Sequence, residues 1–178
     1  MGRGSDAVQW KSATVFGCAA LMAAVAHADE VPVHALHLPG VSHHFGAPKE
    51  PGKSWNEFHD GVGFQSTTVR DDRVRRWTAG FMRDSFGKQG LYGGVAYGLR
   101  LHDAAVSVDA ALAPMLLYRT TTFDSSSRKL IPIVLPTVSI EHKHSGIGAN
   151  LTVLPAGNFG KDLKFPGLVY LQFTVRLG

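Results

Sequence analysis

Apolar and polar residues alternate with a period of two along most of the chain, which is the pattern of half-buried β-strands. The alternation is clearest near the C-terminus, where Val169, Leu171, Phe173, Val175 and Leu177 interleave with polar residues. It predicts eight strands, at residues 35–44, 60–69, 74–84, 90–101, 105–117, 131–143, 147–154 and 167–177.

The connections between these segments alternate in length. Longer ones span residues 45–59, 118–130 and 155–166, with a shorter one at 85–89, and tight turns fall at 70–73, 102–104 and 144–146. Short turns on one rim and long loops on the other are typical of an outer-membrane barrel, and closure removes the unpaired edge strands. We therefore predict an all-β fold, an eight-stranded antiparallel up-and-down transmembrane β-barrel.

A soluble antiparallel barrel or sandwich would show the same alternation, so only the residue types can distinguish it from a membrane barrel. The polar positions are mostly Gly, Ala, Ser and Thr, which are too small and too weakly charged for a typical wet surface. Aromatic residues lie near segment ends, at Tyr92, Tyr118 and Tyr170, where the girdle of a membrane barrel belongs. Both features favour the membrane barrel.

The first 28 residues have the three parts of a secretory signal peptide. A polar start with Arg3 and Lys11 precedes an apolar run over residues 13–26, which is too short to span a bilayer, and small residues stand at Ala26 and Ala28. We predict cleavage after Ala28 and a single barrel domain over residues 29–178.

Cysteine and charge narrow the chemistry of that domain. The only cysteine of the chain lies in the predicted signal peptide, so the mature domain has no disulfide and no thiol nucleophile. The formal net charge is +4 for the whole chain and +3 once Arg3, Lys11 and Asp6 of the signal peptide are removed, which is too mild to indicate a particular partner. An exported chain is not expected to bind nucleic acid.

Three segments carry a resemblance to a known family. They are Leu-Pro-Gly-Val-Ser-His-His at 38–44, Arg-Asp-Ser-Phe-Gly-Lys at 83–88, and the proline-rich pair Leu-Ile-Pro-Ile-Val-Leu-Pro at 130–136 and Leu-Thr-Val-Leu-Pro at 151–155. In this order they resemble the lipid A palmitoyltransferases, the PagP-like outer-membrane acyltransferases. The resemblance implies a monomeric enzyme that transfers an acyl chain, palmitate or slightly shorter, from a phospholipid donor to lipid A, with its active site facing the cell exterior.

The resemblance also implies the catalytic residues His44, Asp84 and Ser85. The family histidine stands five residues after a proline, which places it at His44 after Pro39, although a shift by one residue would select His43. The predicted strands put all three residues on one rim. A covalent acyl-enzyme and direct attack by the acceptor hydroxyl both stay open, and we predict no cofactor and no metal.

The remaining family positions concern the lipid substrates. Pro136 and Pro155 match prolines that flank a lateral lipid opening, while Pro39 matches a second opening whose partner is not evident. Lys53 matches a position linked to lipid A recognition. The predicted acyl-chain slot uses the small residues Gly94, Ala96 and Gly98, and Ala96 stands where the family has a glycine that limits chain length.

Two rival functions remain. A lipid A deacylase would draw on the segment Glu-His-Lys-His-Ser at 141–145, which is predicted on the opposite, periplasmic rim. A non-enzymatic small outer-membrane barrel would explain the strands but not the shared rim of His44, Asp84 and Ser85.

Overall fold

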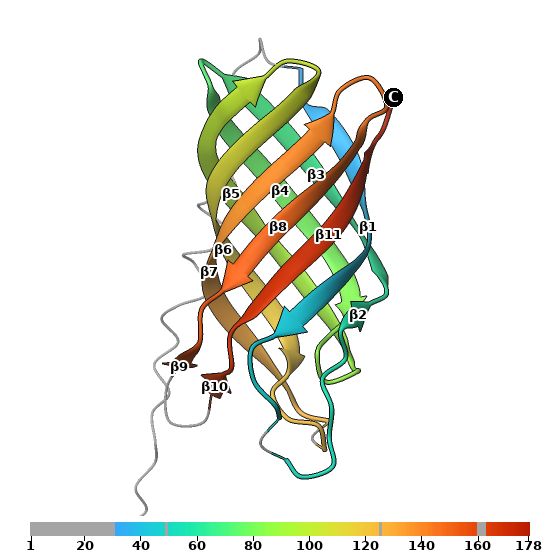
Figure 1. Cartoon of the computed structure of the whole chain (residues 1–178), viewed down its shortest axis with the longest axis vertical. Coiled ribbons are helices and arrows are strands. Elements are labelled where there is room, and N and C mark those ends of the chain that lie inside the picture. The colour runs from blue at the N-terminus through green and yellow to red at the C-terminus, as the bar shows by residue number, and fades with distance from the viewer. Residues whose placement is uncertain (1–30, 49, 125, 160–162) are drawn as a thin grey trace, which may run out of the picture.

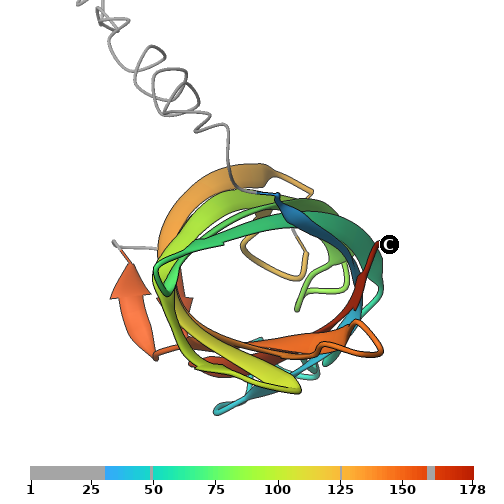
Figure 2. The same cartoon turned by 90° about the horizontal axis from the view of Figure 1, so that it is seen from above.

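The structure, a computed structural model, describes residues 31–48, 50–124, 126–159 and 163–178, so the predicted signal peptide lies outside it. The chain forms a closed antiparallel barrel of eight wall strands, in which the last strand pairs with the first (Figures 1 and 2). The wall strands are β1 (Val33–His44), β3 (Gly61–Arg70), β4 (Arg73–Arg83), β5 (Gln89–Asp103), β6 (Val106–Thr120), β7 (Arg128–His142), β8 (Ile147–Leu154) and β11 (Leu168–Arg176). No helix in the described residues is long and apolar enough to cross a membrane.

The eight predicted strands are confirmed, and their ends differ by a few residues. β6 and β7 run further than the alternation predicted and stay paired up to Thr120 and Arg128, which shortens the predicted loop between them. The alternation of apolar and polar residues ends where polarity rises, but ladder hydrogen bonds form between backbones whatever the side chains are. Short strands also occur within two predicted loops: β2 (Phe58–His59) pairs with β1, and β9 (Gly157–Phe159) pairs with β10 (Leu163–Phe165).

Each wall strand pairs with the next one along the chain, so successive strands end at opposite rims. β1, β4, β6 and β8 end at the rim that carries the longer connections, which lies at the lower end in Figure 1 and is called the long-loop rim below. The opposite turn rim has tight hairpins. Asp71 and Asp72 have positive φ angles of 46° and 63°, as the two central residues of a type I′ hairpin turn require.

The outer surface of the barrel is apolar on every wall strand. Its large exposed side chains include Val41 on β1, Phe64 on β3, Phe81 on β4, Leu99 on β5, Leu112 on β6, Val134 on β7, Leu151 on β8 and Phe173 on β11. The interior is instead rich in buried polar residues. This distribution is the reverse of that in a soluble protein.

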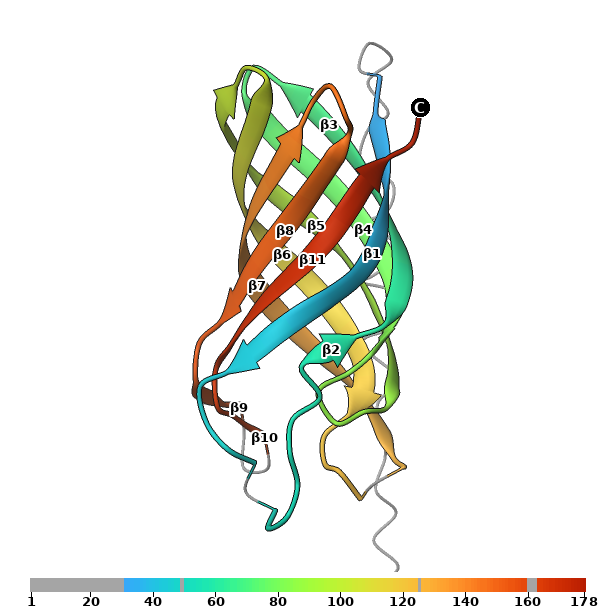
Figure 3. The same cartoon turned by 45° about the vertical axis from the view of Figure 1, so that its right-hand side comes forward.

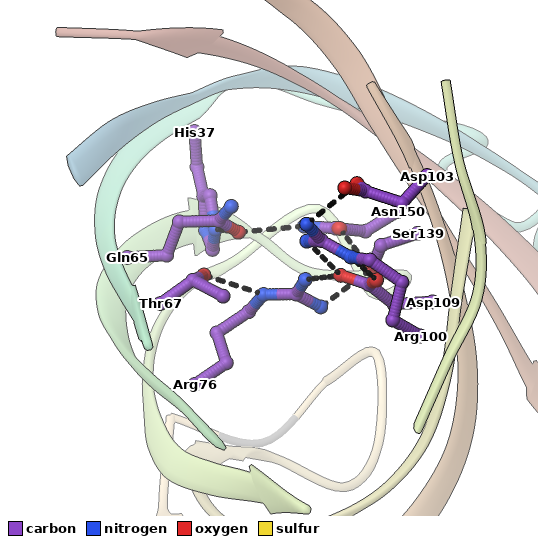
Figure 4. Close-up of polar contacts among 9 residues, drawn as sticks. All are labelled: His37, Gln65, Thr67, Arg76, Arg100, Asp103, Asp109, Ser139 and Asn150. Atoms are coloured by element: carbon purple, nitrogen blue, oxygen red, sulfur yellow. Dashed lines mark hydrogen bonds and ion pairs between the residues drawn. The ribbon is translucent and has the colours of Figure 1, made fainter. Parts of the chain in front are cut away.

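The interior polar residues meet in one hydrogen-bonded group, called the polar layer below. It takes residues from all eight wall strands: His37, Gln65, Thr67, Arg76, Tyr92, Arg100, Asp109, Ser139, Asn150 and Gln172. At its centre the two carboxylate oxygens of Asp109 accept hydrogen bonds from Arg76 Nη2 at 2.9 Å and Arg100 Nε at 2.8 Å (Figure 4).

The other half of the polar layer is closed by neutral groups. Gln65 Oε1 accepts from His37 Nε2 at 2.9 Å and from Asn150 Nδ2 at 3.0 Å, while Tyr92 donates its hydroxyl to His37 Nδ1 at 2.8 Å. Because these groups satisfy one another, the barrel can enclose them without leaving polar atoms unpaired.

We predict that Asp109→Ala lowers the free energy of unfolding by about 3–5 kcal/mol, because it leaves the buried Arg76 guanidinium without a carboxylate and Arg100 with only the half-exposed Asp103. Asp103→Ala is the matched control: its carboxylate pairs with Arg100 and Lys143 but is about half exposed, so it should cost about 1 kcal/mol or less. Urea titration in lipid vesicles measures both variants. Equal losses would contradict a central role for Asp109.

Candidate functional site

A cavity of about 130 Å³ lies inside the barrel between the polar layer and the long-loop rim. Its wall is mainly apolar, with Ala96, Ala113, Met115, Ile133 and Leu135, whereas Ser42, His59, Asp84, Ser85 and Arg119 line its rim end. A second, polar cavity of about 330 Å³ lies on the turn side, and Gln65, Arg76 and Asn150 line both. The polar layer therefore divides the lumen into two parts.

A bulge in β1 decides which side chains of this strand reach the interior. β1 and β11 lie side by side in the barrel wall (Figure 3). Their pairing shifts by one residue between His37 and Gly40, around Pro39, whose nitrogen has no proton for the ladder. Before the bulge an odd-numbered residue, His37, is buried in the interior. After the bulge an even-numbered residue, His44, is buried instead. The structure thus turns His44 inward, while His43 is exposed on the outer side.

His44 is held at the rim by two contacts from the loop that follows β1. Its Nδ1 lies 3.2 Å from Glu57 Oε1, and its ring stacks on Trp55 with ring centres 4.7 Å apart. The same Trp55 also contacts Phe86 and Phe123, at 5.5 and 5.3 Å, which fastens three rim loops together. His44 is 7% exposed and is not part of the cavity wall.

Asp84 organises the tight loop after β4. Its Oδ1 accepts the backbone N–H groups of Phe86 and Lys88, each at 2.9 Å, and its Oδ2 accepts the Thr120 hydroxyl at 3.2 Å. Among the described residues neither carboxylate oxygen is bonded to His44. The structure therefore uses this carboxylate to fix the loop, and it does not form the His–Asp pair that one of the predicted roles requires.

Ser85 follows Asp84 in the wall of the cavity and is 3% exposed. The loop after β1 holds its backbone, since Ser85 O accepts the N–H of Asn56 at 2.9 Å. Within the described part of the chain, the Ser85 hydroxyl and the His44 ring share no hydrogen bond. The predicted trio thus shares one rim, as expected, without being directly connected.

A serine–histidine pair that the sequence reasoning missed does line the cavity. Ser42 Oγ lies 2.8 Å from His59 Nε2, and His59 Nδ1 donates to the backbone carbonyl of Arg83 at 2.7 Å. Ser42 is on β1 and His59 on β2, so only the pairing of these strands brings them together. Ser42 and His44 are two residues apart and so share one face of β1, which was the one signal for this pair in the sequence. That this face is the inner one depends on the bulge, which the sequence did not predict.

Glu57 connects this pair with His44. Its Oε2 accepts the Ser42 hydroxyl at 2.8 Å, and its Oε1 lies 3.2 Å from both the His44 backbone nitrogen and the His44 ring. Partial burial alone would raise the pKa of Glu57, but the hydrogen bonds from Ser42 and His44 outweigh it and lower that pKa below its ordinary value. Glu57 is therefore a fixed carboxylate beside the cavity.

Arg119 adds a positive charge to the same end of the cavity. It is 8% exposed, its nearest carboxylate oxygen is Asp84 Oδ2 at 3.4 Å, and its guanidinium lies over the Phe86 ring. Its Nε has no hydrogen-bond partner among the described residues. A buried guanidinium with spare donors suits an anionic or carbonyl oxygen of a ligand.

Of the predicted slot residues, Ala96 belongs to the cavity wall and the two glycines do not. A Cβ on Gly94 would come within 2.4 Å of the Pro114 oxygen, and one on Gly98 within 2.0 Å of the Ala110 oxygen. Neighbouring backbone, not open space, occupies the room that these glycines leave. Ala96 pairs directly with Arg76, so its methyl group stands where the apolar cavity meets the polar layer.

The two prolines predicted to flank a lateral opening lie at a break in the barrel ladder. β7 pairs with β8 only from His142 back to Thr137, and the register of the two strands ends at Pro136, which lacks a backbone N–H. Pro155 directly follows the last residue of β8, across from it. Ile133, Leu135 and Leu154 bring the cavity wall to this break.

Lys53 lies in the loop after β1, away from the cavity wall. Its Nζ is 2.8 Å from Asp124 Oδ1 in the loop after β6, and this hydrogen bond raises the pKa of Lys53 above its ordinary value. The segment considered for a deacylase lies at the turn rim, where the exposed His142 and Ser145 are 2.9 Å apart. Among the described residues no three His, Cys, Asp or Glu side chains form a group that could hold a metal ion.

Known proteins do not identify a family for this chain. No protein-family model matches the chain, and no curated protein sequence matches it significantly. Among solved structures it is similar to the Yersinia pestis outer membrane protein Ail, whose backbone structure was determined in a phospholipid bilayer nanodisc. The TM-score is 0.44 at 14% identity, over 83% of this chain and 100% of that one. At this level the similarity says nothing about function.

We predict that the rim loop after β1 is anchored through the charge of Glu57. Because the folded-state pKa is lowered, the stabilisation is fully present above the unfolded value of about 4.3 and is lost as the pH falls through the folded value. Hydrogen exchange of the 45–57 segment, corrected for intrinsic rates, should show wild-type protection at pH 7 that falls only in acid. Glu57→Gln should already be less protected at pH 7 and change little below it. A variant as protected as the wild type at pH 7 would remove this role.

Proposed function

We propose that this protein is an outer-membrane acyltransferase that moves an acyl chain from a phospholipid to lipid A, with its site facing the cell exterior. One observation carries the proposal: an apolar cavity inside the barrel ends at a rim where the half-buried Ser42 meets the buried His59. The order of the segments at 38–44, 83–88, 130–136 and 151–155, which resembles that of the lipid A palmitoyltransferases, supports the same reaction.

The membrane location rests on the two faces of the barrel wall. Apolar side chains cover the outside of all eight wall strands, whereas the inside holds paired polar groups. In water such an exterior would be an aggregation hazard, and in a bilayer it is the favourable surface. The long loops are expected on the cell exterior and the tight turns in the periplasm, as in outer-membrane barrels generally.

In this proposal an acyl chain lies in the cavity with its end toward the polar layer. Its apolar wall would take the hydrocarbon, and the polar layer gives a floor that an apolar chain end does not penetrate, since charged groups there would lose their partners. The ester group would then lie at the rim beside Ser42, His59 and Ser85, and Arg119 would face the donor phosphate or the ester carbonyl. The break at Pro136 and Pro155 is the proposed sideways entrance for lipid.

We predict that His44→Ala and Ser85→Ala each reduce transfer by about 10²- to 10⁴-fold, because the resemblance assigns both residues to catalysis and a positioned catalytic group usually contributes this much. His44 holds the Glu57 carboxylate, and Ser85 lies in the cavity wall. The assay is purified protein with labelled phospholipid and lipid A, read by mass spectrometry of both lipids. His43→Ala, which alters an outward-facing ring, should retain activity.

The same assay separates the rival functions. Acylated lipid A together with lysophospholipid supports the proposal, whereas loss of acyl chains from lipid A would indicate a deacylase. No change in either lipid, with folded protein, would favour a non-enzymatic barrel. An inactive His43→Ala with a fully active His44→Ala would show that the site was assigned to the wrong histidine.

A second prediction concerns the length of the acyl chain that is transferred. If the chain end meets Ala96, Ala96→Gly should shift the preference toward a longer acyl chain, because one methyl group of overpacking typically costs about 1–3 kcal/mol. A difference near the lower end of this range changes relative rates by about tenfold. Donors that differ by one or two methylenes measure the shift, and coincident profiles for wild type and variant would exclude Ala96 from the floor.

The third prediction concerns the acceptor. We propose that Lys53 contacts a lipid A phosphate, which must compete with Asp124 for the ammonium group. Lys53→Ala should raise the KM for lipid A and leave the rate with saturating acceptor unchanged, and Asp124→Asn should lower that KM. Unchanged kinetics in both variants would remove the proposal for Lys53.

A further inference from the structure

We propose that Ser42 is the nucleophile of this site and His59 its general base, so that transfer proceeds through an acyl group covalently bound to Ser42. This inference rests on the proposed acyl transfer and deepens it by naming the attacking atom. The resemblance on which the first site assignment rests points instead to His44, Asp84 and Ser85, so the two assignments can be distinguished by experiment.

The tautomer of His59 is fixed by its neighbours. A backbone carbonyl only accepts hydrogen bonds, so the 2.7 Å contact with Arg83 O places a proton on His59 Nδ1. In the neutral ring the lone pair is then on Nε2, which is the atom 2.8 Å from Ser42 Oγ. The ring is also held edge-on against Tyr170, at 5.2 Å between ring centres. A base whose far nitrogen is oriented by an acceptor is the arrangement that activates a hydroxyl nucleophile.

The Ser42 hydroxyl proton has two acceptors at equal distance. Glu57 Oε2 and His59 Nε2 each lie 2.8 Å from Ser42 Oγ, so rotation about the Cβ–Oγ bond carries the proton from the carboxylate to the imidazole. Glu57 itself is fixed through its second oxygen by His44. His44 is therefore a positioning residue in this scheme, and it acts on the reaction only through Glu57.

Substrate access separates Ser42 from the other candidates. Ser42 and His59 both line the cavity, and Ser42 is half-buried rather than enclosed. The Ser85 hydroxyl lies in the same wall but has no imidazole bonded to it among the described residues. Of the two cavity serines, only Ser42 thus has a base in place.

The proposed transfer uses only Ser42, His59 and the two lipids. Ser42 Oγ attacks the ester carbonyl carbon of the phospholipid while its proton moves to His59 Nε2. The carbonyl π electrons form the oxyanion, and their return breaks the bond to the glycerol oxygen, which takes the proton from His59. Lysophospholipid leaves, and a lipid A hydroxyl then attacks acyl-Ser42 in the same way, its proton passing through His59 to Ser42 Oγ.

A hexadecyl fluorophosphonate tests the proposal, because a serine activated by a base displaces its fluoride and keeps the phosphonyl group. With the folded chain in detergent, intact mass and peptide mapping should show one adduct on Ser42. Ser42→Ala should give no adduct, and His59→Gln should react at least about 100-fold more slowly, the lower range for loss of a general base. The matched control is Ser145→Ala, which removes the exposed serine–histidine pair at the turn rim and should react like the wild type.

Lipid A transfer measured on the same preparations separates this inference from the proposed function. An adduct on Ser42 without lipid A acylation supports the nucleophile and rejects lipid A as the acceptor. Lipid A acylation by a protein that gives no adduct, or an adduct on Ser85, overturns the inference and leaves the proposed function standing. Absence of both adduct and transfer in folded wild-type protein overturns both.

Discussion

The Asp109 carboxylate between Arg76 and Arg100 is the interaction on which the rest of the lumen depends. The shared carboxylate compensates the two positive charges inside the barrel. The neutral polar groups around them satisfy one another's hydrogen bonds. Because the resulting polar layer draws on all eight wall strands, it fixes their relative registers and closes the lumen across its width. The space toward the long-loop rim is left as a blind apolar cavity.

The chemistry at the mouth of this cavity depends on one irregularity of the backbone. The bulge around Pro39 exchanges the inward and outward positions of β1, so that Ser42 and His44 turn inward together. The short strand β2 then places His59 against Ser42, and Glu57 ties both to His44. A regular ladder would have pointed His43 into the barrel and left this rim without its serine–histidine pair.

The sequence predicted the barrel well because alternation is repeated in every strand, and each segment independently indicates the same fold. It also predicted that His44, Asp84 and Ser85 share a rim, which follows from strand order alone. It did not predict the Ser42–His59 pair, since that contact depends on a bulge and a two-residue strand. Nor did it predict that backbone fills the space beside Gly94 and Gly98, because pairing geometry is not visible in residue types.

We propose that the polar layer makes the lumen a blind slot that holds an acyl chain between this layer and the long-loop rim. Paramagnetic broadening by a phospholipid that carries a nitroxide near the end of one acyl chain tests it directly, in protein with labelled alanine and threonine methyl groups. We expect strong broadening of Ala96 and Ala113 and none of Thr174, which faces the cavity on the turn side. Broadening confined to outward-facing methyl groups, or extending equally to Thr174, would contradict it.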